Sequence, residues 1–209
     1  MRKIPYNKSS LSKQRQQDKL YRKLLPSLDL KRRQLTAELN KARAQLERQR
    51  RELDEFVPAV AADLPMLANQ QIALGDLVRI ESVEVGEENV LGAKIPVFRS
   101  VETTVTPYSF LTKPHWVDAF VVRLQEAAEL IARAEIAHDR VERLAQALKR
   151  VTQRVNLFEK VLIPQAAENI RKIVIFLADA ERSAVVRSKI FKERQRALNA
   201  ERRAALDAS

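Results

Sequence analysis

Apolar residues recur along two long stretches of the chain in alternating steps of three and four residues. The first repeat is carried by Leu35, Leu39, Ala42, Leu46, Gln49, Leu53, Phe56 and Val60, with one polar position. The second is carried by Val141, Leu144, Leu148, Val151, Val155, Phe158 and Leu162. Such a repeat gives a helix one apolar stripe, and two stripes can cover each other in a coiled coil. The pattern predicts a hairpin of two long antiparallel helices.

The first helix is expected to begin after Ser9 and Ser10, whose hydroxyls can cap exposed amides, and to end near Val60. Its apolar residues should continue the repeat at Leu20, Leu24 and Leu28. Pro26 lies inside this stretch. Because an internal proline removes a backbone hydrogen bond and costs about 3 kcal/mol, we expect a kink or a late helix start there.

The second helix is expected to begin around Thr112 to Trp116 and to run nearly to the C-terminus, with Thr112 as a possible cap. Near Pro164 its apolar steps change to consecutive steps of four residues, from Leu162 to Ala166 and on to Ile170. A stutter of this kind locally unwinds a left-handed supercoil.

Between these helices the periodicity is lost, and all three glycines of the chain lie here. Leu77 to Val85 is predicted to form one strand, Glu87 to Asn89 a polar turn, and Val90 to Val101 an edge strand that can hold Pro96. The predicted segments are therefore a coiled-coil helix at 1–60, an insert with a short β-hairpin at 61–118, and a second coiled-coil helix at 119–209. The fold class is all-α dominated, a long antiparallel two-helix coiled coil with a small β-hairpin insert at one end.

The net charge of +11 is unevenly distributed along the chain. Residues 1–33 hold 11 basic and 2 acidic side chains, and residues 182–203 hold 8 and 2, whereas residues 61–118 hold 4 basic against 8 acidic side chains. If the helices are antiparallel, the two basic ends meet and form a basic tip opposite an acidic end. Composition leaves three interpretations of this tip open: a grip on nucleic-acid phosphates, a fit to an acidic protein cavity, or ordinary solvated helix faces.

Residues that could carry chemistry are sparse. The chain has no cysteine, which excludes disulfides, thiol nucleophiles and cysteine-bound metals. The glycines form no phosphate-binding loop, and His115 and His138 begin no metal-ligand motif. Glu87 and Glu88 suit a solvated turn as well as a carboxylate pair. We therefore expect no catalytic residues, cofactor, metal or nucleotide site. Neither a membrane span nor a signal peptide is evident, which predicts a cytosolic or peripheral protein.

One segment carries a more specific signal. The run from Arg154, Val155 and Asn156 through Glu159 to Ile163 and Pro164 resembles the C-terminal signature of the D subunit of the V-type and A-type rotary ATPases. Further matches are Asn89, Gly92 and Pro96 in the insert, Ile170, Ile173, Leu177, Asp179, Glu181, Arg182 and Lys189 after the signature, and a weaker region from Leu28 to Leu35. The resemblance spans the chain in the right order. It departs from the family near Pro26 and at Arg33, where members usually show a small and an acidic residue.

The resemblance implies a central rotor stalk that carries torque between the catalytic head and the ion-translocating ring in the membrane, in ATP synthesis or in hydrogen ion transport. It implies a chain that is not an enzyme and that is cytoplasmic and peripheral to the cell membrane. The implied partners are the A and B subunits of the catalytic head, the small F subunit of the stalk, and the stalk subunit (d/C type) that caps the ring. The basic tip would enter the head.

Two other classes remain as alternatives. A basic coiled-coil scaffold or nucleic-acid-binding protein would use the charged ends, with an affinity for duplex DNA that falls steeply with salt. A shaft of the gamma type from F-type synthases has equivalent mechanics. Its middle segment is a larger α/β domain, which the 58-residue insert fits badly.

Overall fold

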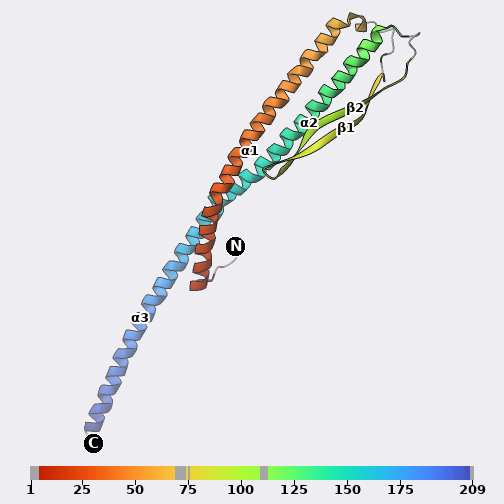
Figure 1. Cartoon of the computed structure of the whole chain (residues 1–209). Helices are drawn as coiled ribbons and strands as arrows, with labels where there is room; N and C mark the ends of the chain where they lie inside the picture. The colour runs from red at the N-terminus through yellow and green to blue at the C-terminus, as the bar shows by residue number, and fades with distance from the viewer. Residues whose placement is uncertain (1–4, 69–73, 75, 109–112, 208–209) are drawn as a thin grey trace. The chain divides into compact units, whose positions relative to one another are not determined.

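Two long helical stretches flank a β-hairpin in the computed structural model, which describes residues 5–68, 74, 76–108 and 113–207 (Figure 1). The elements in chain order are α1 (Lys8–Asp63), a short 3-10 helix (Pro65–Ala68), β1 (Val78–Val90), β2 (Ala93–Val105), α2 (Trp116–Leu157), a π-helical turn (Phe158–Leu162) and α3 (Ile163–Asp207). The predicted fold class, helices with a small β-hairpin, is confirmed. The division into segments 1–60, 61–118 and 119–209 stays a prediction.

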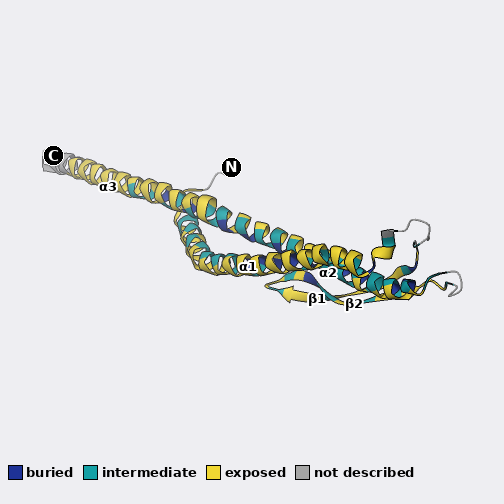
Figure 2. Cartoon of the chain, turned by 90° about the horizontal axis from the view of Figure 1, so that it is seen from above, coloured by how far each residue is buried: buried dark blue, intermediate teal, exposed yellow. Residues whose placement is uncertain are grey.

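The chain forms two compact units, one made of residues 29–153 and the other of residues 1–28 with 154–209. In the first unit the predicted seam of α1 is buried at Leu35, Leu39, Ala42 and Leu46. Figure 2 shows buried residues of the chain in dark blue. Helix α2 buries Leu144 and Val151 as predicted, and also Val117, Val121, Ala128 and Ala132. More of α2 is buried than one seam requires because α1 and the hairpin both cover it (Figure 1).

The hairpin is longer than predicted, and its turn lies elsewhere. Strands β1 and β2 pair in antiparallel register from Val78 opposite Val105 to Val90 opposite Ala93. The predicted turn residues Glu87 to Asn89 belong to β1, and the chain reverses at Leu91 and Gly92, whose φ angles are 53° and 82°. Two positive φ values in a two-residue loop are what a type I′ turn needs, because its twist matches that of the strands. Sequence reasoning missed this turn because leucine rarely adopts a positive φ.

The second unit pairs the start of α1 with the end of α2, the π-helical turn and α3. Tyr6 contacts Phe176, Gln14 accepts a hydrogen bond from Asn169 at 3.4 Å, and Tyr21 contacts Phe158. Residues later in α1 thus contact residues earlier in the facing helical stretch. These helices are therefore antiparallel.

Helix α1 begins earlier than predicted and is continuous. The side-chain Oδ1 of Asn7 accepts the backbone N–H of Ser10 at 2.7 Å, so Asn7 is the cap and the prediction of a start after the serines is wrong. The helix also continues through Pro26 to Asp63, which rules out a late start at that proline. The second predicted cap, Thr112, lies outside the described residues.

The extension of the seam into this part of α1 was assigned two wrong positions, although Leu28 is half-covered as predicted. Leu20 and Leu24 are exposed, and the half-covered positions are Leu11, Gln14, Asp18, Tyr21, Leu25 and Leu28. The reason is the phase of the repeat. Steps of three and four counted back from Leu35 reach Leu28, Leu25 and Tyr21, whereas steps of four alone drift off the seam.

The two basic ends of the chain do not lie level with each other in their unit. The Nζ of Lys8, the first residue of α1, lies 3.9 Å from the carboxylate of Glu181, and every residue from Asp179 to Asn199 is exposed. The basic residues that follow Glu181 therefore lie past the start of α1. The predicted tip is made mainly by α3.

Candidate functional site

The signature segment lies at the junction of α2, the π-helical turn and α3. Only one of its six matched residues is buried: Val155, at 2% exposure, faces the seam. Asn156 and Ile163 are half-buried, whereas Arg154, Glu159 and Pro164 are exposed. The segment thus combines one packing residue with an outer surface that other molecules can reach.

The π-helical turn accounts for the stutter near Pro164. The backbone N–H of Ile163 bonds to the carbonyl of Phe158, five residues back, so this turn holds one residue more than an α-helical turn. Pro164 has no N–H, and in a regular helix its ring would clash with the carbonyl of Lys160. The extra residue both accommodates the proline and returns Ala166 and Ile173 to the seam, where they are 3% and 0% exposed.

In the other unit, the matched hairpin residues shape its turn and its attachment. The Oδ1 of Asn89 accepts the N–H of Gly92 at 2.8 Å, which closes the turn. Gly92 holds the positive φ, and a Cβ there would lie 3.5 Å from the Nζ of Lys31 on α1. Pro96 and its neighbour Ile95 are buried, so this end of β2 is covered.

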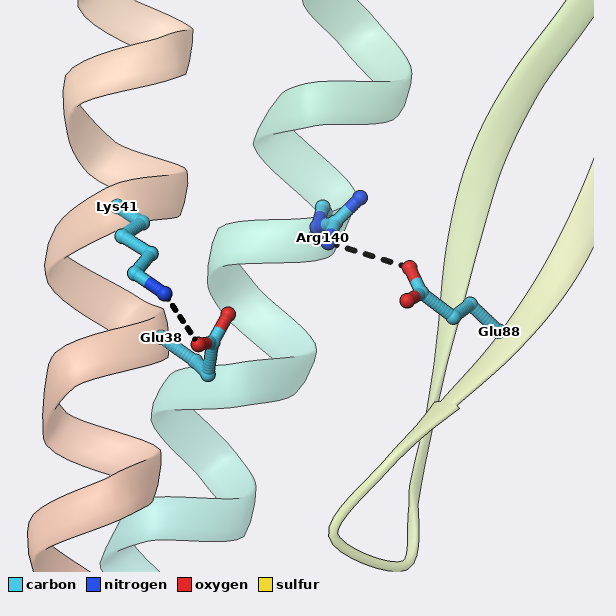
Figure 3. A network of polar contacts seen from close by, with 4 residues as sticks. All are labelled: Glu38, Lys41, Glu88 and Arg140. Carbon is cyan, nitrogen blue, oxygen red and sulfur yellow. Dashed lines mark hydrogen bonds and ion pairs between the residues drawn. The ribbon is translucent and has the colours of Figure 1, made fainter.

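Contacts between the hairpin and α2 include polar and aromatic ones. A guanidinium nitrogen of Arg140 lies 3.3 Å from the carboxylate of Glu88, across the space between α2 and β1 (Figure 3). Arg133 stacks over the ring of Phe98, and Gln125 donates to the hydroxyl of Thr103 at 3.1 Å. Sequence patterns missed these contacts, because nothing along the chain indicates which residues of α2 meet the strands.

The end of this unit has a small core of its own. Leu77, Val117 and Val121 are buried together, with Trp116 and Phe120 packed against them. Beside it, the Tyr108 hydroxyl donates to the Asp118 carboxylate, and this bond to a negatively charged acceptor raises the pKa of Tyr108. Arg123 bridges from α2 to Asp63 at the end of α1, at 2.8 Å. These contacts hold the unit together at the end where α1 finishes and α2 begins.

Within the described residues, no group of three or more histidines and acidic side chains is placed to hold a metal ion. His138 lies on the surface of α2, 3.7 Å from Glu142. A search of the same residues for a helix long and apolar enough to cross a membrane finds none.

Comparisons with known proteins identify a family. The family model for the D subunit of ATP synthase matches residues 10–193. The D subunit of a V-type ATP synthase from Borreliella burgdorferi is 31% identical over 192 residues, covering 92% of this chain and 95% of the relative. The corresponding protein of Chlamydia muridarum is 32% identical over 198 residues, covering 91% and 95%. That of Chlamydia felis is 37% identical over 122 residues, covering 58% and 59%.

Proposed function

Because the chain belongs to the family of ATP synthase D subunits, we propose that it is the central rotor shaft of a V/A-type ATPase or ATP synthase. In this role it transmits torque between the catalytic head and the ion-translocating ring in the membrane. It is a non-catalytic subunit, and ATP is made or hydrolysed on other chains. It works in the cytoplasm, peripheral to the cell membrane, as part of a membrane-bound complex.

The observation that carries this proposal is the seam of each unit. Every fully buried residue of the described chain is apolar, and most of these residues recur along α1, α2 and α3 at heptad spacing. A shaft must resist twisting, and interlocked apolar side chains resist it because each is held by residues of the facing helix.

The outer faces also suit a shaft that turns inside other subunits. Ion pairs such as Arg51 with Glu47, Lys172 with Glu168 and Arg182 with Asp179 lie on the helix surfaces and join residues within one helix. Exposed pairs contribute little free energy, so contacts made through them can be exchanged as the shaft turns. The basic end of α3 suits the cavity of a head subunit of opposite charge.

The proposed partners are the A and B subunits of the head, the small F subunit of the stalk, and the stalk subunit that caps the ring. The test is purification of the tagged chain from its own cells, with washes from 0.1 to 0.5 M salt. Head and stalk subunits should remain bound at the higher salt, whereas proteins and nucleic acid held only by the net charge of +11 should be lost. A chain recovered alone, or with DNA retained at high salt, would contradict the proposal.

A further inference from the structure

One side of the unit formed by residues 1–28 and 154–209 exposes four large aliphatic side chains. Leu20 and Leu24 on α1 are 51% and 40% exposed. Leu157 at the end of α2 and Val161 in the π-helical turn are 46% and 47% exposed. Aliphatic side chains gathered in one place on a helical surface mark a contact site more often than isolated ones do.

The four side chains are brought together by the symmetry of an antiparallel pair. Tyr21 on α1 contacts Phe158 on the facing helix, with ring centroids 5.3 Å apart. Leu20 precedes Tyr21 by one residue and Leu24 follows it by three; Leu157 and Val161 stand in the same relation to Phe158. A two-fold axis through this contact relates antiparallel helices and keeps equivalent positions on the same side of the seam. The four residues therefore form one surface, which we call the lateral patch.

The surroundings of the lateral patch are basic. Lys23, Arg154 and Lys160 are exposed at the neighbouring outward positions of the same helices. The opposite side of the unit differs: there α1 presents Lys8, Arg15 and Lys19, around a shallow surface hollow, in place of exposed leucines. Beside the contact of Tyr21 with Phe158, α1 thus exposes leucines on one side and basic residues on the other.

We propose that the lateral patch docks an amphipathic helix of another protein, with an apolar face and acidic flanking residues. Two aliphatic side chains one helical turn apart on each of two helices form a surface that suits the apolar stripe of a third helix. The basic border selects acidic flanks and disfavours a second copy of this chain, which would bring basic border against basic border. Such an apolar contact is fixed, unlike the exchangeable contacts of the charged faces.

Site-specific labelling tests the docking, because the chain contains no cysteine. Leu24→Cys places a thiol in the lateral patch, and the matched control Lys19→Cys places one on the opposite side. With a maleimide reagent, both should react at similar rates in the isolated chain. In the complex purified from cells, Leu24→Cys should react at least tenfold more slowly, while Lys19→Cys should be unchanged. Equal rates at both positions in the complex, whether fast or slow, would contradict one-sided docking.

A crosslink then identifies the occupant. Leu157→Cys carrying a photoreactive maleimide should join the chain, within the purified complex, to a helical segment with aliphatic residues at spacings of three and four and acidic neighbours. Capture of a second copy of this chain, or of a basic or non-helical segment, would overturn the proposal. These results are separate from the proposed function: a complex with head subunits but an unprotected Leu24→Cys would contradict the docking alone.

Discussion

At the scale of single residues, the turn of the hairpin depends on a few side chains around Gly92. Asn89, Gly92 and Pro96 were singled out by resemblance, and the structure places Asn89 and Gly92 in one turn through a 2.8 Å hydrogen bond. Leu91, which precedes Gly92 in the turn, was not predicted to be a turn residue. The contacts of Arg140 with Glu88 and of Arg133 with Phe98 could not be predicted either, because they depend on how the hairpin packs against α2.

Leu91 provides a prediction at this scale. Its φ of 53° is strained for leucine, whereas asparagine tolerates this region and Asn-Gly is the preferred pair of a type I′ turn. Leu91→Asn should stabilise the hairpin by about 1 kcal/mol. Hydrogen exchange at the amides of Val90 and Ala93, which pair beside the turn, should slow by about fivefold. Faster exchange than in the unchanged chain would show that Leu91 contributes packing that outweighs the strain.

A buried residue of the signature allows a second prediction. Val155 is 2% exposed, so Val155→Asp leaves a carboxylate in an apolar seam and should reduce the free energy of unfolding by roughly 3 kcal/mol or more. The matched control is Val174→Asp in the same unit, at a position that is 40% exposed, which should change it by about 0.5 kcal/mol or less. Denaturant unfolding followed by circular dichroism measures both. Similar losses for the two variants would mean that Val155 is not part of a seam that holds the helices together.

At the scale of elements, the heptad pattern predicted the helices and most of the seam. An apolar stripe indicates a helical period, and because it must be covered, it also indicates that a second helix packs against it. It was less informative where the pattern was weak. Leu20 and Leu24 were placed on the seam because they are leucines, yet the phase set by Leu35 and Leu39 puts Tyr21 there instead. The turn of the hairpin was misplaced for a similar reason, because polar residues indicated a turn where the strand continues.

The π-helical turn provides the prediction at this scale. If its extra residue serves to accommodate Pro164, removing exposed Lys160 together with Pro164→Ala should yield a continuous α-helix with Val155 and Ile173 still on the seam. The thermal unfolding midpoint should then change by only a few degrees. Removing exposed Arg171, from a regular part of α3, rotates everything after it by about 100°. Because this rotation takes the fully buried Ile173 off the seam, it should lower the midpoint more than the first change does. The opposite order would contradict the account.

At the scale of the whole molecule, the family membership and the proposed mechanical role support each other, and each rests on different observations. The family follows from matches over most of the chain. The proposed mechanical role is inferred from seams that bury only apolar residues and from helices that display charge outside. The signature links the two, because Val155 packs in the seam while Arg154 and Glu159 face outward. What the proposed shaft would turn, and against what, would lie in other subunits, so no residue of this sequence could predict it.

The most direct test of the shaft is to watch it turn. Because the chain has no cysteine, Arg79→Cys on exposed β1 gives it a single site for a probe. With the head of the purified complex fixed to a surface, the account predicts that a probe on this residue rotates in one direction when ATP is supplied and stops when ATP is removed. A probe that stays still while the same complexes hydrolyse ATP would contradict the central claim.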